Sequence, residues 1–400
     1  MSRLLRVLPV ALLTLVMTSS AFAATPRRPE VPRAPSPTTA TPDVHAEVAK
    51  FAALVQQRTD NLSSLAGQRV GVARQLAQVR KVELLLGTQE DSLAERAATA
   101  KQRYETARKA VARMAVASYT AGAGTSDLMS VLDSKDVLEL SRRTALLDEI
   151  ASMQQQRIAQ ARKDRSLAEQ AAKAAQHEVK QLHDTDDNLS NTLADLDGQM
   201  TNVRASLDRA TNWYAKWDSI VAGTATPILG QEVLTGADLA TWFAANRRDA
   251  HITVPMSELA NDYIQEGAAA GVRGDIAFAQ SLLETASFRF PAGGQLTPDD
   301  NNFAGIGACD SCATGRSYPS ADIGVRAQVQ LLRVYADRNL TNAELHPPAV
   351  DPRLDTHFLK GKVTTWGGLT HTWATANGYG DRILQIYTQI LAWLTDQANI

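Results

Sequence analysis

The chain has 400 residues, of which 44% are hydrophobic and 21% are charged, and its formal net charge at pH 7 is −2. This length is sufficient for more than one folding unit. The near balance of charges gives no general attraction to nucleic acid, so composition argues against a nucleic-acid-binding protein and decides little else about function.

The first 23 residues have the features of a cleaved export signal. Arg3 and Arg6 precede an apolar run over residues 8–17, and Ala21 and Ala23 supply small side chains at the two positions that a signal peptidase recognises. The run is too short for a comfortable membrane span, and no cysteine near the cleavage site can carry a lipid. We expect a secreted or cell-wall-associated protein without a stable membrane span; an uncleaved N-terminal anchor is the alternative.

Residues 24–43 are expected to form a linker. The segment from Pro26 to Pro42 is rich in Pro, Ser, Thr and Ala, a composition that cannot bury a core and favours extended conformations. Such a segment can reach through a cell wall, or it can be an ordinary disordered linker.

Residues 44–222 are predicted to form a long antiparallel coiled coil. Apolar residues recur at alternating steps of four and three over residues 44–118 and again over residues 137–221, which is the spacing of a coiled-coil seam. At 1.5 Å per residue each helix would be roughly 110 to 130 Å long. Gly122 and Gly124 are expected to break the first helix, so the second folds back along it.

The turn of this hairpin is followed by an unusually apolar segment, residues 128–143. It is similar to the tip of coiled-coil modules on secreted peptidoglycan hydrolases that work with a division-associated, ABC-transporter-like membrane complex. The resemblance implies regulation or docking to such a partner; a passive spacer or a dimerisation rod is the alternative.

Aromatic residues close the second long helix and begin the segment that follows it. Trp213, Tyr214 and Trp217 are expected to form a hydrophobic plug where the coiled coil meets the next domain, with a carbohydrate platform as the alternative. The connecting segment, residues 223–249, contains a capped amphipathic helix that begins at Thr235.

Residues 250–400 are expected to form a separate, mostly helical domain. A helix that starts at Ser257 carries acidic residues at every fourth position, Glu258, Asp262 and Glu266, which is typical of a solvated face. Further apolar-periodic helices are predicted over residues 324–336 and 381–396.

A helix that starts at Asp275, its expected N-cap, places Glu284 near its C-terminal end. Glu284 follows two leucines, so its carboxyl group should emerge at the edge of apolar packing, where desolvation raises a carboxyl pKa. An acid that keeps its proton near neutral pH is what cleavage of a glycosidic bond requires. A surface glutamate near a helix end is the alternative.

Three ordered blocks of sequence carry a family resemblance: AQSLLET at residues 279–285, NNFAGIG at residues 301–307 and WATANGYGDRI at residues 373–383. They resemble the bacterial endo-β-N-acetylglucosaminidase family (mannosyl-glycoprotein endo-β-N-acetylglucosaminidase-like) that cuts peptidoglycan glycan strands. The likeness covers about residues 250–395 and implies a lysozyme-like fold. By position it implies that Glu284 is the general acid, that Tyr379 is the active-site tyrosine, and that Asn302 and Phe303 belong to the floor of the substrate-binding cleft.

Two tryptophans and two cysteines complete the expected site. Trp366 and Trp373 are candidates for stacking on sugar faces, with packing in the core as the alternative. Cys309 and Cys312 are expected to form a small structural disulfide that shapes the cleft, because the chain offers neither a second ligand pair for zinc nor a thioredoxin-like unit. No metal or cofactor is expected.

The second catalytic acid stays open at this stage. Asp299, Asp300 and Asp310 all lie in loops near the cleft motif. Retaining, inverting and substrate-assisted hydrolysis are therefore not distinguished.

The expected fold class is mainly α, with a long antiparallel coiled-coil hairpin followed by a lysozyme-like, mostly helical catalytic domain. The expected function is secreted peptidoglycan hydrolysis at N-acetylglucosamine, with glycan strands as the substrate and a membrane division complex as a partner of the coiled-coil tip. A lytic transglycosylase and a non-catalytic wall-binding scaffold that recruits another hydrolase are the alternatives.

Overall fold

The structure is a computed structural model that describes residues 41–123, 137–247, 249–308, 314–341, 344–345, 349–350 and 358–398. Within these residues the protein is helical, and β-structure is confined to isolated bridges such as that between Leu229 and Val272. The expected mainly α fold class is confirmed. None of the helices in these ranges is both long and apolar enough to span a membrane.

Several sequence predictions fall outside the described residues. They concern the export signal at residues 1–23, nearly all of the linker, the hairpin tip up to residue 136, and the loop that holds Cys309, Asp310 and Cys312. These remain predictions.

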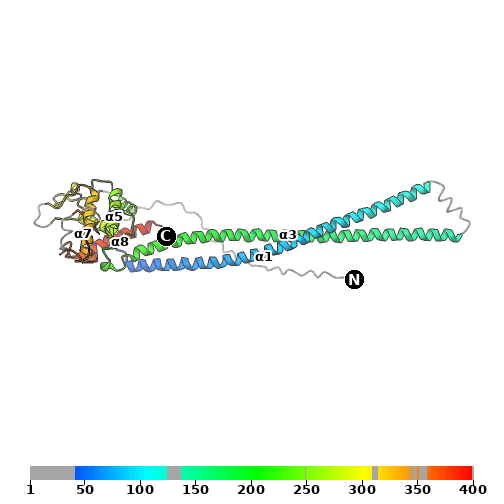
Figure 1. The fold of residues 1–400 in the computed structure, drawn as a ribbon, viewed down its shortest axis with the longest axis horizontal. Helices are drawn as coiled ribbons and strands as arrows, with labels where there is room; N and C mark the ends of the chain where they lie inside the picture. Colours follow the sequence, from blue (N-terminus) through cyan, green and yellow to red (C-terminus); the bar gives the residue numbers. More distant parts are fainter. Residues whose placement is uncertain are drawn as a thin grey trace. The chain divides into compact units, whose positions relative to one another are not determined.

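Two long helices, α1 (Val44–Ala123) and α3 (Val137–Asp218), lie side by side (Figure 1). Within the described residues, ion pairs link Arg69 with Asp197 and Arg80 with Asp186, and His183 Nδ1 lies 3.4 Å from Glu83 Oε1. The residue number on α3 falls by the same step as the number on α1 rises, which defines an antiparallel register. Because most of these charged groups are exposed, the pairs stabilise the hairpin little.

An apolar seam holds the two helices together. Leu65 and Leu76 on α1 and Leu196 and Met200 on α3 are each at most 7% exposed. All four occupy heptad positions predicted from the sequence. Burial of an aliphatic side chain contributes roughly 1.5–3 kcal/mol, so the seam outweighs the exposed ion pairs.

The end of the hairpin near residues 51 and 217 packs into the core of the C-terminal domain. Phe51 stacks on Trp213 with ring centroids 6.5 Å apart, and both belong to the same apolar cluster as the core of the domain. Trp217 is fully buried, and its Nε1 donates a 3.1 Å hydrogen bond to Thr395 Oγ1. The hydrophobic plug expected for Trp213 and Trp217 is therefore confirmed.

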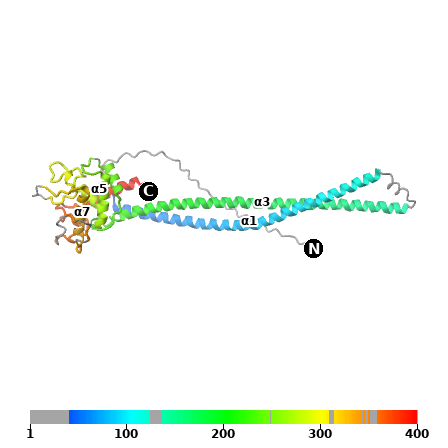
Figure 2. The same cartoon turned by 45° about the horizontal axis from the view of Figure 1, so that its top comes forward.

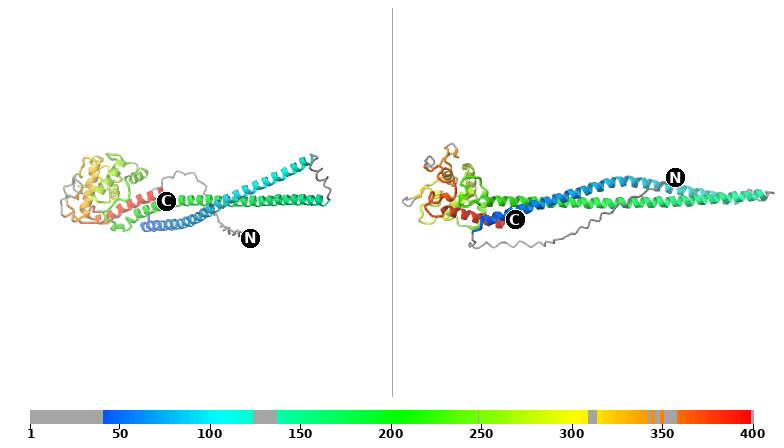
Figure 3. Two further views of the ribbon diagram at one scale, coloured as in Figure 1. Left: turned by 45° about the vertical axis from the view of Figure 1, so that its right-hand side comes forward. Right: turned by 90° about the horizontal axis from the view of Figure 1, so that it is seen from below.

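The C-terminal domain contains the helices α4 (Gly236–Asn246), α5 (Met256–Ala270), α6 (Gly274–Glu284), α7 (Ala321–Ala336) and α8 (Tyr379–Gln397), with the short 3₁₀ helices η1 (Gly223–Ala225), η2 (Pro298–Asp300) and η5 (Gly367–Leu369). Helix α6 is the central element, because every residue from Gly274 to Leu282 is buried. It packs against α5, α7 and α8. Of these, α5 and α7 also pack against each other and are labelled in Figure 2. Helix α8 also contacts the end of α3 (Figure 3).

Glycines allow α5 and α6 to approach closely. A Cβ at Gly274 would lie 2.0 Å from the carbonyl oxygen of Tyr263, and a Cβ at Gly267 would lie 2.6 Å from the Cα of Gly274. No larger residue fits either position without moving a backbone. The contact brings the face of α5 that carries Tyr263 against α6.

The acidic face predicted on α5 is solvated only in part: Glu258 is exposed as expected, whereas Asp262 is half-buried and Glu266 is buried, which corrects the prediction for these two residues. Glu266 is buried and accepts hydrogen bonds from the Arg326 guanidinium of α7 at 2.7 and 2.9 Å. Burial, with smaller contributions from Asp322, Glu258 and Glu266, raises the pKa of Asp262 to about 6. Residues spaced by four lie on one face of a helix, and part of this face of α5 packs against α7.

Candidate active site

Glu284 is the last residue of α6, at the point where the buried helix ends. Burial raises the pKa of its carboxyl group, while hydrogen bonding from Tyr379 and Trp373 lowers it by a smaller amount, and the net direction is upward. A raised pKa was expected from the two leucines that precede Glu284. The carboxyl group therefore keeps its proton to a higher pH than a free glutamate does.

Tyr379 is the first residue of α8 and is buried, and its hydroxyl donates a short hydrogen bond to Oε1 of Glu284. Burial, reinforced by the charge of Glu284, raises the pKa of the Tyr379 hydroxyl well above its usual value. Tyr379 thus remains protonated and acts as a donor. The structure brings together the two residues that the resemblance assigned to catalysis.

Asn302 holds the loop that passes in front of Glu284. Its side-chain amide donates to the carbonyl oxygens of Ile306 at 2.9 Å and of Arg316 at 2.8 Å, and its Oδ1 accepts from the amide of Ile306 at 3.0 Å. The Phe303 ring is packed edge-on against Phe288, with centroids 5.9 Å apart. Asn302 and Phe303 are both buried, so their side chains pack into the protein below the loop surface. They support the loop beneath the site.

Gly305, in the same loop, lies against the second oxygen of the Glu284 carboxyl group. Its φ is +64°, and a Cβ added there would lie 3.1 Å from Glu284 Oε2. Glycine adopts this left-handed conformation without the steric cost of a side chain. It also leaves Oε2 uncrowded on that side.

A left-handed turn follows Glu284 directly. Ala286, Ser287 and Phe288 have φ values of 52°, 63° and 59°, a conformation that costs on the order of 1–3 kcal/mol per non-glycine residue. Thr285 stabilises the turn, because its Oγ1 accepts from the amide of Phe288 at 2.8 Å and its hydroxyl donates to Ser281 O at 2.7 Å. The fully buried ring of Phe288 anchors the turn in the core. The backbone that follows Glu284 is therefore held in place by hydrogen bonds and by packing.

The two candidate tryptophans have different environments. Trp366 is fully buried, so it has no face to offer a sugar, and the expected substrate contact is corrected to a core position. Trp373 is partly buried, packs on Tyr335 with centroids 5.7 Å apart and contributes a hydrogen bond that lowers the pKa of Glu284. Only Trp373 of this pair lies at the site.

Asp300 stabilises the loop in which it lies. Its Oδ2 accepts from the amide and the hydroxyl of Thr297 at 2.7 and 2.8 Å, and its Oδ1 accepts from the hydroxyl of Ser317. Burial raises the pKa of Asp300, but these hydrogen bonds outweigh burial and lower it overall. Both oxygens are thus occupied in holding the loop. The side chain of Asp299 is exposed.

Across the described part of the chain, no group of three or more His, Cys, Asp or Glu side chains is arranged to hold a metal ion.

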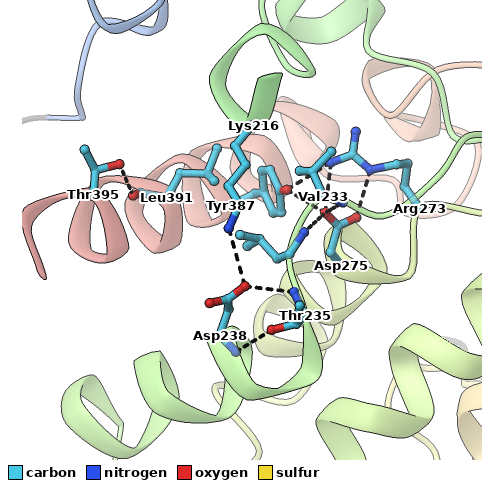
Figure 4. Close-up of polar contacts among 10 residues, drawn as sticks. Lys216, Val233, Thr235, Asp238, Arg273, Asp275, Tyr387, Leu391 and Thr395 are labelled. Carbon is cyan, nitrogen blue, oxygen red and sulfur yellow. Dashed lines mark hydrogen bonds and ion pairs between the residues drawn. The ribbon is translucent and has the colours of Figure 1, made fainter. Parts of the chain in front are cut away.

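A second polar cluster fixes the start of α6 against α8 (Figure 4). Asp275 is fully buried and accepts from Arg273 Nε at 2.8 Å, from the Tyr387 hydroxyl at 2.6 Å and from the amide of Val233 at 3.1 Å. The prediction that Asp275 caps α6 is wrong, because Arg273 is the N-cap and Asp275 lies within the first turn. The carboxylate instead joins three segments.

One polar residue beside Glu284 and Tyr379 was not predicted from the sequence. Gln280 is buried and its Nε2 donates a 2.8 Å hydrogen bond to the Tyr379 oxygen. Its position four residues before Glu284, on the same face of α6, was the available signal. Hydrogen bonds thus join α6 and α8 at two places, between Gln280 and Tyr379 and between Asp275 and Tyr387.

Comparison with known proteins agrees with this arrangement. Residues 260–391 match the sequence model of the Glucosaminidase family, described as mannosyl-glycoprotein endo-beta-N-acetylglucosaminidase. The match confirms the resemblance that the three sequence blocks indicated, and it supports a glycosidase in general.

One curated relative is an uncharacterized protein of Borreliella burgdorferi (strain ATCC 35210 / DSM 4680 / CIP 102532 / B31). It is 32% identical over 139 residues, which is 34% of this chain and 64% of that protein. The match thus spans less than two thirds of the relative's length. The search of solved structures gave no match.

Proposed function

We propose that this protein is an exported endo-β-N-acetylglucosaminidase that hydrolyses the glycan strands of peptidoglycan. The observation that carries the proposal is the hydrogen bond from Tyr379 to Glu284, inside the range that matches the Glucosaminidase family. The export signal and the Pro-rich linker expected at the N-terminus support a site of action outside the cell.

In this proposal Glu284 is the general acid. Burial raises its pKa, so it holds its proton to a higher pH than a free glutamate does, and the bond from Tyr379 to Oε1 leaves Oε2 as the oxygen that delivers the proton to the glycosidic oxygen. As the bond breaks, the proton moves to the leaving group and Glu284 becomes a carboxylate, which the Tyr379 hydroxyl stabilises. Hydrolysis consumes one water and creates a reducing end on N-acetylglucosamine.

The hairpin of α1 and α3 is proposed to be a regulatory or partner-docking arm. Its aromatic residues Phe51, Trp213 and Trp217 share the apolar core of the catalytic domain, which supports a mechanical link between the two parts. The resemblance of the hairpin tip to other peptidoglycan hydrolases supports a membrane division complex as the class of partner.

Mass spectrometry of glycan fragments tests the proposed reaction. Purified peptidoglycan is digested with the whole chain, because a fragment that starts at residue 226 would lack the buried Trp217. New reducing ends on N-acetylglucosamine would support the proposal. Anhydro-muramic ends would identify a lytic transglycosylase, and binding to the wall without new ends would identify a scaffold.

Glu284→Gln is the matched variant for this assay. The amide keeps the size of the side chain and an acceptor for Tyr379 but has no acidic proton, so cleavage should fall by about 10²- to 10⁴-fold. Thermal unfolding should change little. Cleavage at the wild-type rate would refute the role of Glu284.

A further inference from the structure

A chain of buried hydrogen bonds leads from Glu284 into the core. Beyond the bond between Gln280 and Tyr379, Gln328 Nε2 of α7 donates to Gln280 Oε1 at 2.9 Å, and the Tyr263 hydroxyl of α5 donates to Gln328 Oε1 at 2.7 Å. Tyr263, Gln280 and Gln328 are all fully buried. This hydrogen-bond chain thus includes residues of four helices, α5, α7, α6 and α8, and ends on the proposed catalytic acid.

Every donor in this chain points toward Glu284. Gln328 is fixed in orientation, because its Nε2 also donates to Ala277 O at 3.1 Å while its Oε1 accepts from Tyr263. Gln280 must then turn its oxygen toward Gln328 and its NH₂ toward Tyr379, since the opposite orientation would place two NH₂ groups against each other. The Tyr379 oxygen accepts from Gln280, and its single hydrogen remains for Glu284.

We propose that Gln280 is a positioning residue which, held by Gln328 and Tyr263, fixes the Tyr379 hydroxyl as a donor to Glu284 Oε1 and reserves Oε2 for the catalytic proton. The inference rests on the proposed function, because it concerns how Glu284 delivers that proton. Donors aligned in series polarise one another, so the chain also strengthens the last bond. Gln280 does this from the core, without surface to touch a substrate.

The pKa of Glu284 is set by burial and by uncharged hydrogen-bond donors. Within the described ranges, the influences on the pKa of Glu284 are burial, Tyr379 and Trp373, none of which is a charged group. Tyr379 of α8 is the titratable side chain that contacts it, and α5 and α7 contribute Tyr263 and Gln328 through the chain. The nearest ion pair on α6, Arg273 with Asp275, lies at the opposite end of that helix.

Gln280→Met in the whole chain tests the proposal. The variant keeps the length of the side chain but removes the donor to Tyr379, so kcat for release of reducing ends should fall by about threefold to tenfold while KM stays unchanged. The alkaline limb of the profile of kcat/KM against pH should move to higher pH, because a less stabilised carboxylate holds its proton more tightly. An unchanged pH profile would overturn the proposal.

Gln330→Met is the matched control. Gln330 is also a fully buried glutamine, on α7, and its Oε1 accepts from the amide of Val350 at 3.0 Å, outside the chain that ends on Glu284. This variant should not move the alkaline limb. A shift equal to that of Gln280→Met would show a general effect of core packing and would also overturn the proposal.

Tyr263→Phe provides an independent variant if Gln280→Met does not fold. It removes only the first donor and keeps the ring, which packs edge-on against Phe278 with centroids 5.5 Å apart. The alkaline limb should move in the same direction but by less. If the alkaline limb did not move in this folded variant, the proposed role of the hydrogen-bond chain would be contradicted.

Titration of Glu284 separates the inference from the proposed function. Carboxyl resonances of ¹³C-glutamate in the whole chain are followed against pH, and Glu284→Gln identifies the resonance. If the wild type creates no new ends, the proposed function fails, but a resonance whose midpoint rises in Gln280→Met still supports the chain. If the wild type cleaves and the midpoint does not move, only the further inference fails.

Discussion

Tyr379→Phe removes one oxygen from the centre of the proposed site. In the wild type that oxygen donates to Glu284 Oε1 and accepts from Gln280 Nε2 at 2.8 Å. A hydrogen bond to a charged group contributes about 1.5–3 kcal/mol, and this one strengthens as Glu284 becomes a carboxylate. Loss of that stabilisation should lower kcat by about ten- to a hundredfold, since about 1.4 kcal/mol corresponds to a factor of ten.

The same substitution should change both the pH profile and the stability. The bond from Tyr379 lowers the pKa of Glu284, so its removal should raise that pKa further and move the alkaline limb of activity to higher pH. The buried Nε2 of Gln280 loses its acceptor, which should lower the free energy of unfolding by about 1–3 kcal/mol.

Initial rates of release of reducing ends from peptidoglycan, measured from about pH 4 to about pH 9, provide the assay, with denaturant unfolding alongside. Tyr214→Phe at the end of the hairpin is the control for loss of a tyrosine hydroxyl away from the site, and it should leave both limbs in place. If Tyr379→Phe kept the wild-type kcat and the wild-type alkaline limb, the reasoning about the Glu284 pair would be refuted.

Two further predictions concern Gly305 and Asp262. Gly305→Ala should lower kcat more than Gly293→Ala does, because both glycines have left-handed φ values, +64° and +84°, but only a Cβ at residue 305 would approach Glu284; equal rates would contradict this. The pKa of Asp262 is about 6 in the folded protein, above its value of about 3.9 in the unfolded chain. Asp262 therefore does not lower the free energy of unfolding below about pH 3.9, and its destabilising effect develops as pH rises to the folded pKa and is complete above it. Asp262→Asn should therefore raise the free energy of unfolding by about 1 kcal/mol near pH 8, a value reduced for solvent screening, and should give no gain near pH 4; an equal gain at both would exclude titration as the cause.

Local sequence patterns were sufficient for the hairpin and for several helix ends. The heptad positions Leu65 and Met200 are buried in the seam as predicted, because the side of a helix that a residue occupies depends only on its spacing from its neighbours. Thr235 caps α4 through a capping box with Asp238, a motif contained within four residues. Such features depend on contacts within one or two turns.

The predictions that were wrong concern residues whose partners are distant in sequence. Glu266 has the spacing of a solvated residue but pairs with Arg326, and Asp275 has the chemistry of an N-cap but accepts hydrogen bonds from Val233 and Tyr387. Trp366 lies in an aromatic segment that suits a binding cleft, yet it is buried. Spacing along one helix does not reveal which other helix will cover it.

Sequence patterns alone predict the helical class, the heptad positions of the apolar seam and the candidates Glu284 and Tyr379, because periodicity, caps and ordered motifs are local properties. That these two side chains meet, with Gln280 bonded to Tyr379, is visible only in the folded protein. That meeting depends on how α8 lies along α6, and the helix packing around it depends on the close approach of α5 to α6 at Gly274. Packing of this kind arises from the mutual fit of side chains far apart in the chain, and no short stretch of sequence contains it.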